Sequence, residues 1–233
     1  MAPDRGDARG RRCRNRLLAS LSESEWGCLA PYLIRVPLTV NQYLYRQGHP
    51  IDRVYFPESS IASLIVTTID GRSVEVGVVG SQGAAGVGAS DGSPMPCDVV
   101  VQVAGDALAL RPEDLPRGGA AERILAAVLG RYTHALLAQT IQIAACNRLH
   151  TIRQRAARWI LTMADRVDSA RLPLTHDLLA TMIGARRASI SAVAGNMQHS
   201  GLIEYRHGKL RIRDRRRLER AACECYQKLK VHS

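Results

Sequence analysis

Apolar positions along residues 172–214 follow first a helical and then a strand-like spacing. One helical face comprises Leu178, Leu179, Met182 and Ile183, and a second comprises Ile190, Val193, Ala194 and Met197. Both sets recur at intervals of three or four residues, as in an amphipathic helix. Thr175 is a good N-cap for the first helix, and Gly184 tolerates the positive φ of a sharp turn after it. We therefore predict a helix-turn-helix whose second helix begins near Arg187.

Two short apolar runs, Leu202–Tyr205 and Leu210–Ile212, follow the second helix and flank the basic turn Arg206–Lys209. This pattern predicts a two-stranded β-wing. In such modules, the outward face of the second helix meets base edges in the DNA major groove. The residues that we expect to contact DNA are Thr175, Arg186, Arg187, Ala188, Ser189, Ser191, Ala192, His207 and Lys209.

Residues 33–111 show a different pattern, in which short runs typical of β-strands alternate with turns. The predicted strands are Asp52–Phe56, Ile61–Ile69, Ser73–Val79, Val99–Val103 and Ala107–Leu110. Asp70-Gly71 predicts a two-residue hairpin turn between two of them. Several short strands at this spacing indicate an antiparallel β-barrel or jelly roll. Short helices are expected before them, with Ser22 and Glu25 spaced as a capping box.

A long helical pattern runs from about Ala120 to Cys146, and a further helix is predicted over about His150–Val167. An apolar seam of this length between two domains is a candidate dimer interface. Its members are Leu125, Leu129, Tyr132, Leu136 and Ile143. The alternative is a helix that packs its apolar face into the core of its own chain.

The positive charge is concentrated in the C-terminal part of the chain. Residues 146–233 carry 18 of the 32 Lys and Arg residues but only 7 of the 21 acidic residues, so they account for the whole formal charge of +11. Charge of this kind beside a groove-reading helix is typical of phosphate contacts. The aromatic content of 4% offers few rings for unstacked bases, which favours double-stranded DNA over RNA.

Other classes of protein are less compatible with this sequence. We find no paired-carboxylate, nucleophile–base, Walker or HExxH motif, so we do not expect an enzyme. The sequence contains no apolar run long enough to span a bilayer and no secretory segment, so we expect a cytoplasmic protein without a membrane partner. Six scattered cysteines without a CxxC pair argue against a zinc site or a disulfide framework, and we interpret Cys223 and Cys225 as ordinary thiols.

Four segments, taken together with the order of barrel, long helix, helix-turn-helix and wing, resemble the Crp/Fnr superfamily of bacterial transcription regulators. The segments are YLYRQGHPIDRVYFPESSIASLI (Tyr43–Ile65), DGRSVEVGVVGSQGAAGV (Asp70–Val87), RLHTIRQRAARWIL (Arg148–Leu161) and LTHDLLATMIGARRASISAVAGNMQHSGLI (Leu174–Ile203). The resemblance implies an α+β fold with an N-terminal cyclic-nucleotide-binding-like jelly roll, a long dimerisation helix and a C-terminal winged helix-turn-helix. It also implies a homodimer that binds a palindromic operator and works with RNA polymerase.

The resemblance gives the following expected organisation. Residues 1–16, which are rich in arginine, form a disordered basic arm, and 17–117 form the sensor domain. Residues 118–147 form the dimerisation helix, and 148–233 form the DNA-binding domain.

The chain departs from the family pattern where nucleotide-binding members hold the cyclic phosphate with a Gly-Glu pair and a later Arg. Ala84 and Ala85 stand near the place of the Glu, and no Arg follows in Met95–Asp98. Without a guanidinium, an anion would depend on backbone N–H groups alone. We therefore expect no tight binding of cyclic AMP or cyclic GMP. The residues of a weak effector pocket are Gly80, Gly83, Gly86 and Cys97, although glycines also suit a barrel corner.

Cofactor-binding relatives also differ from this chain. Cys13 and Cys28 are too few for the N-terminal iron–sulfur cluster of oxygen-sensing members. We interpret His134 and His150 as isolated structural residues rather than haem ligands, so we expect neither a cofactor nor a metal.

The predicted recognition helix also departs from the family pattern. Well-known members present Arg, Glu and a later Arg on its outward face. This chain has Arg187 at the first of these places but Ala188 and Ala192 at the other two. Arg187 can bind guanine O6 and N7, and the alanines can contact a thymine methyl group. We therefore expect an operator different from the family's best-known palindrome. Two functions follow, namely a regulator whose barrel senses an unknown signal, or an architectural or partner-docking DNA-binding protein without an effector.

Overall fold

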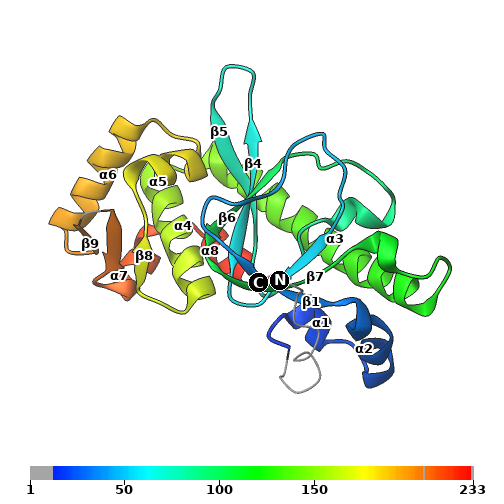
Figure 1. The fold of residues 1–233 in the computed structure, drawn as a ribbon. Helices are drawn as coiled ribbons and strands as arrows, with labels where there is room; N and C mark the ends of the chain where they lie inside the picture. Colours follow the sequence, from blue (N-terminus) through cyan, green and yellow to red (C-terminus); the bar gives the residue numbers. More distant parts are fainter. Residues whose placement is uncertain (1–12, 207, 232–233) are drawn as a thin grey trace. The chain divides into compact units, whose positions relative to one another are not determined.

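The computed structural model describes residues 13–206 and 208–231, and Figure 1 shows the elements along the chain. It divides into two compact units. One unit contains the chain up to Leu64 together with Gly77–Leu137, and the other contains Ile65–Val76 together with the chain from Ala138 onward. Most of the predicted basic arm, residues 1–12, lies outside the described residues.

Three short helical segments precede the strands, and local side-chain caps determine where two of them begin. They are α1 (Arg16–Ala19), α2 (Glu23–Leu29) and η1 (Ala30–Tyr32). Asn15 caps α1, and its buried amide also donates to the carbonyl oxygens of Pro57 and Gly83. The predicted capping box is present, because Ser22 and Glu25 each bond to the backbone of the other.

The strands of the N-terminal part form two antiparallel sheets, which confirms the predicted jelly roll, although the sheets do not close into a barrel. One sheet has the order β1-β7-β3 and the other the order β2-β6-β4-β5. Their bounds are β1 Ile34–Leu38, β2 Tyr43–Tyr45, β3 Val54–Pro57, β4 Ile61–Thr67, β5 Ser73–Val79, β6 Asp98–Val103 and β7 Gly105–Leu110. Two short 3-10 helices, η2 (Val87–Ser90) and η3 (Pro112–Asp114), follow β5 and β7.

The turn between β4 and β5 differs from the predicted two-residue turn. The backbone N–H of Gly71 donates to Thr68, and that of Thr68 donates to Arg72, so the loop contains three residues, Ile69, Asp70 and Gly71. Gly71 has a φ of 81°, whereas Asp70 is not among the described non-glycine residues with positive φ. A type I′ turn needs positive φ at both central residues, and a three-residue loop needs it only at the last. The prediction of an Asp70-Gly71 two-residue turn was therefore wrong.

Helix α3 (Ala120–Leu149) runs slightly past the predicted end at Cys146. None of the helices in the described part of the chain is long and apolar enough to cross a membrane. Most of the predicted dimer seam is buried within this single chain. Leu125, Leu129 and Tyr132 pack into the same core as residues of β3 and β7, Leu136 packs at its edge, and Ile143 is also buried.

Leu125, Leu129 and Tyr132 fill the core of their own chain, which agrees with the alternative interpretation of this helical face. The large apolar side chains that α3 exposes are Leu137 at 55%, Ile141 at 61% and Leu149 at 75%, and the first two lie one helical turn apart. Helical periodicity predicted the apolar face that contains Leu125 and Tyr132. It did not reveal the second apolar face, which contains Leu137 and Ile141 and is exposed.

The ring of Tyr132 lies directly on the backbone of Gly83, in the loop that follows β5. A Cβ atom at Gly83 would lie 2.3 Å from the hydroxyl end of that ring. The Gly83 carbonyl oxygen accepts the bond from Asn15 on its other side, so the loop cannot easily move away. Position 83 therefore requires glycine, because Tyr132 and Asn15 both approach its backbone closely.

The C-terminal part is organised around α4 (Ile152–Val167). Thr151 caps this helix in a capping box with Gln154, which places its start after the predicted His150. The inward face of α4 contains Trp159, Ile160 and Met163, as predicted, and the helix packs against α5 to α8 and β8. The remaining elements are β8 (Arg171–Pro173), α5 (His176–Ile183), α6 (Arg187–His199), β9 (Ile203–Arg206), β10 (Lys209–Ile212), α7 (Arg215–Ala221) and α8 (Cys225–Val231).

The wing is a three-stranded sheet of order β8-β10-β9, rather than the predicted two-stranded one. Leu210 of β10 pairs with Leu172 of β8 and Tyr205 of β9. The sequence pattern missed β8 because three residues, one of them proline, carry almost no strand periodicity.

The tip of the β4–β5 hairpin belongs to the same compact unit as α4 to α8. The buried carboxylate of Glu75 accepts a 3.0 Å hydrogen bond from the indole N–H of Trp159. Val74 lies against Gly184, where an added Cβ would meet its side chain at 2.9 Å. The hairpin therefore contacts both α4 and the turn before α6.

Gly83→Ala tests the close approach of Tyr132. We expect the free energy of unfolding to fall by about 1–3 kcal/mol, because the new methyl group overlaps the ring. Chemical denaturation measures this change. Gly27→Ala in α2 is the matched control, since its Cβ meets nothing within 4 Å, and helix propensity predicts a stabilisation of up to about 1 kcal/mol. Equal effects of the two substitutions would contradict the packing argument.

Candidate DNA-binding surface and glycine-rich loop

Local capping determines where α5 begins and ends. The Thr175 hydroxyl accepts a 3.1 Å hydrogen bond from the Leu178 N–H, as predicted for the N-cap. Gly184 ends α5 with φ 60° and ψ 48°, a left-handed conformation that glycine adopts without a Cβ penalty. The buried residues Met182, Ile183, Ile190, Ala194 and Met197 then hold the two helices together.

The exposed face of α6 has four small residues, Ala188, Ser191, Ala192 and Gly195, between Arg187 and Asn196. Arg187, Ala188, Ser191 and Ala192 are exposed as predicted, whereas Ser189 is half-buried. Gly195 and Asn196 continue this face one turn further along the helix, and both were missed because the sequence argument stopped at Ala192. A face of this composition allows the helix backbone to approach another surface closely, and the Asn196 amide has the donor and acceptor needed for an adenine edge.

Two side chains of this face already have partners on α5. The Arg187 guanidinium forms a 3.1 Å ion pair with Asp177, and both side chains are mostly exposed. The Ser191 hydroxyl lies 3.0 Å from Nδ1 of His176. An exposed pair of this kind contributes only about 0–1 kcal/mol, so a stronger acceptor can displace Asp177 from Arg187.

Basic residues flank the small-residue face. Arg186 is the N-cap of α6, and Lys209 begins β10. Both are exposed, and neither has a carboxylate partner among the described residues. An open groove of about 550 Å³ runs over the wing sheet, and its basic residues are Arg171, Arg206, Lys209 and Arg211. The predicted contact His207 lies outside the described residues.

Glu204 reduces the positive charge at one end of the wing, because its two carboxylate oxygens pair with Arg206 and Arg213 at 3.1 Å each. Tyr205 fixes the wing to the start of the helix-turn-helix. Its hydroxyl donates to the Leu174 carbonyl oxygen, and its ring packs edge-on against His176. Burial raises the pKa of Tyr205, so its hydroxyl remains a donor at physiological pH.

The glycine-rich loop of the candidate effector pocket is filled by the protein's own groups. Gly80, Gly83, Gly86 and Cys97 are all buried, as are the side chains of Ala84 and Ala85. Gly86 has a φ of 98°, and an added Cβ would meet the Tyr45 hydroxyl at 2.6 Å. That hydroxyl donates to the carbonyl oxygen of Ala85. The structure therefore gives Gly83 and Gly86 packing roles.

Comparison with known families identifies both parts of the chain. Residues 35–117 match the cyclic nucleotide-binding domain, and residues 154–221 match the Crp-like helix-turn-helix domain. The two ranges together cover well over half of the sequence. No curated protein is significantly similar in sequence to this chain.

Solved structures of similar fold include a CRP-family transcriptional regulator from Thermus thermophilus, with 22% identity over 80% of this chain and 96% of that one and a TM-score of 0.66. FixK2 from Bradyrhizobium japonicum has 14% identity over 82% of this chain and 98% of its own, with a TM-score of 0.68. The c-di-GMP-responsive regulator CLP from Xanthomonas campestris has 19% identity over 78% and 95%, with a TM-score of 0.63. With both of its domains matched in the family's order, the chain belongs to the Crp/Fnr superfamily of transcription regulators.

Proposed function

We propose that the protein is a homodimer that reads a palindromic DNA operator with α6 and regulates transcription from it through RNA polymerase. The observation that carries this proposal is the exposed small-residue face of α6, bordered by the exposed cations Arg186 and Lys209. The whole net charge of +11 lies in the part of the chain that contains this face. Phosphate contacts would therefore hold the module on DNA while α6 reads the bases.

Arg187 is the strongest candidate for reading a base. It stands at the start of α6, where recognition helices contact base edges, and its exposed guanidinium pairs with Asp177. In a complex, guanine O6 and N7 would replace the carboxylate as acceptors. The methyl groups of Ala188 and Ala192 would contact thymine methyl groups, and Asn196 extends the reading surface.

The dimer interface that we propose uses the exposed side of α3. Leu137 and Ile141 lie one helical turn apart and are more than half exposed, and the small residues Ala127, Gly130 and Ala144 are exposed on the same side. These positions follow a spacing of three and four residues, which suits the pairing of two helices along a seam. A second copy of the chain would cover both aliphatic side chains.

Support for an effector other than cyclic AMP comes from the filled glycine-rich loop. The Glu and Arg that clamp a cyclic phosphate in nucleotide-binding members are missing, and Ala84, Ala85 and Tyr132 occupy the interior beside the loop. The same filling favours the second candidate function, a DNA-binding protein without a small-molecule effector. Binding to the protein's own promoter, with and without cell extract, distinguishes the two, because only a sensor changes its affinity.

DNA affinity should separate base-reading from phosphate-binding residues. Arg187→Ala should cost about 1–3 kcal/mol on a selected operator and relax the base preference at one position per half-site. Lys209→Ala should weaken operator and scrambled DNA alike and reduce the salt slope by about one to two units per dimer. Fluorescence anisotropy at several salt concentrations measures both effects.

Asp177→Asn is the matched control, since it keeps Arg187 and should preserve the preference for the operator. An equal loss on both DNAs for Arg187→Ala would make it a phosphate contact.

Dimerisation should depend on the exposed aliphatic residues of α3. Ile141→Glu should convert a dimer near twice 25.5 kDa into a monomer, because a charge inside a dry interface costs several kcal/mol. Sedimentation or light scattering measures the mass. Val40→Glu is the matched control, since Val40 is also about half exposed but lies outside α3. A monomeric wild type that still binds a palindrome tightly would contradict the proposed interface.

Calorimetry with cyclic AMP or cyclic GMP should show no saturable binding in the micromolar range. No arginine stands within Gly80–Gly86 to bind an anionic phosphate, and the Tyr132 ring and the Tyr45 hydroxyl lie close against Gly83 and Gly86. Saturable micromolar binding of either nucleotide would refute this interpretation of the loop.

A further inference from the structure

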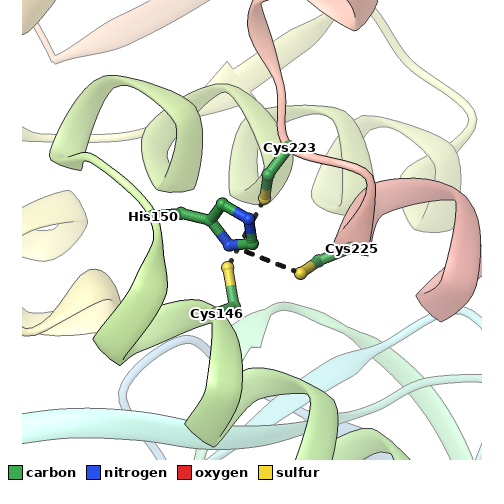
Figure 2. A group of neighbouring side chains, drawn as sticks. All are labelled: Cys146, His150, Cys223 and Cys225. Atoms are coloured by element: carbon green, nitrogen blue, oxygen red, sulfur yellow. Dashed lines mark hydrogen bonds between the residues drawn. The ribbon is translucent and has the colours of Figure 1, made fainter.

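Four side chains that the sequence analysis treated separately meet in the C-terminal part of the chain. They are Cys146, His150, Cys223 and Cys225. Figure 2 shows the three thiols and the imidazole pointing toward one another. Their ligand atoms all lie within 4.8 Å of one another, and the three cysteines are buried. Cysteines that are scattered along the sequence therefore come together in the fold.

Local structure brings two pairs of ligands together. Cys146 and His150 are four residues apart at the end of α3, where the His150 N–H still bonds to the Cys146 carbonyl oxygen as in a helical turn. Cys223 and Cys225 flank one residue between α7 and α8. The first pair therefore shares one helix face, and the second pair approaches it from the C-terminal end of the chain.

Two of the separations match those around a single tetrahedral ion. Zinc–sulfur bonds of about 2.3 Å and zinc–nitrogen bonds of about 2.0–2.1 Å place neighbouring ligand atoms about 3.5–3.8 Å apart. The Sγ atoms of Cys146 and Cys223 are 3.5 Å apart, and Sγ of Cys225 is 3.6 Å from Nδ1 of His150. An iron–sulfur cluster distributes its ligands over two or more irons, whereas these four atoms can all reach one ion.

The groups around the cluster are those that orient metal ligands. The other imidazole nitrogen, Nε2 of His150, lies 3.2 Å from a carboxylate oxygen of Glu224. This contact leaves Nδ1 directed at the thiols, as in a carboxylate–histidine–zinc triad. The Gln142 amide donates a 2.9 Å hydrogen bond to Sγ of Cys225, which stabilises a thiolate there.

A buried cation supplies a second, independent observation. Arg158 is only 2% exposed, its Nε has no hydrogen-bond partner, and no carboxylate pairs with it among the described residues. It lies close enough to Cys146 for the two side chains to interact electrostatically. Three thiolates, one neutral imidazole and one divalent ion have a net charge of −1, which would compensate the buried guanidinium.

We propose that Cys146, His150, Cys223 and Cys225 form a closed structural site for one Zn²⁺ ion per chain. Soft thiolates and an imidazole in tetrahedral arrangement select zinc among the common divalent ions, and binding releases the thiol protons to solvent. All four positions are taken by protein, so the ion holds structure rather than activating a water molecule. It joins the end of α3 to the segment that leads into α8 and thereby ties the two ends of the winged-helix domain together.

The test uses the full-length protein, reduced and stripped of metal, with Zn²⁺ and Co²⁺ as probes. We expect one zinc per chain by elemental analysis, and thiolate-to-cobalt charge-transfer absorption with the visible bands of tetrahedral Co²⁺. Zinc should also raise the melting temperature. Cys146→Ser should lower zinc affinity by at least about 100-fold in a chelator competition and abolish the gain in melting temperature. Cys28→Ser is the matched control, because Cys28 is an exposed thiol outside the cluster.

A second variant keeps the proposal testable if loss of a thiol prevents folding. Glu224 is exposed, so Glu224→Gln should fold normally while it lowers zinc affinity by about 10–100-fold through His150. Reduced protein that binds no cobalt, or cobalt without thiolate absorption, would overturn the proposal. Equal zinc affinities for Cys28→Ser and Cys146→Ser would overturn it as well. None of these measurements involves DNA, so the result is independent of the proposed operator binding.

Discussion

The close contact between Tyr132 and Gly83 is the constraint on which the N-terminal part depends. It fixes a buried side chain of α3 against the loop after β5, while Asn15 binds the same glycine from the other side. One backbone position thereby joins the first helix, the second sheet and the long helix. The loop corresponds to the one that holds a phosphate in nucleotide-binding members of the family. In this chain it packs against the protein's own side chains. A ligand that entered at this loop would first have to displace the protein's own ring.

Helix α4 has a comparable role in the C-terminal part, because it packs against α5 to α8 and β8. Trp159 provides both apolar area and a donor for the buried Glu75, so the β4–β5 hairpin is attached by a satisfied polar contact as well as by packing. Val74 reaches the glycine that sets the angle of α6. The hairpin therefore contacts the turn before α6 directly.

The sequence predicted those features that depend on neighbours in the chain. β5, the Thr175 cap, the Gly184 turn and the start of α6 at Arg187 all have the predicted positions, because capping and periodicity are local. On α3, periodicity did not show that Leu125, Leu129 and Tyr132 pack within their own chain, since both sides of the helix carry aliphatic residues. The cysteine cluster escaped notice because its two halves lie 77 residues apart. The only sequence signal was a Cys-x₃-His spacing on a helix with a Cys-x-Cys pair near the C-terminal end.

The alanines and the glycine on the outer face of α6 have an evolutionary consequence. Side chains this short make few contacts that distinguish one base pair from another. Replacing one of them would therefore cost the protein little of its preference for a DNA sequence. A single substitution at Ala188 or Ala192 could introduce a polar group at a base edge without rebuilding the helix, because both positions are exposed and do not pack in the core. Such a face would allow duplicated copies of the gene to diverge toward new operators in few mutational steps.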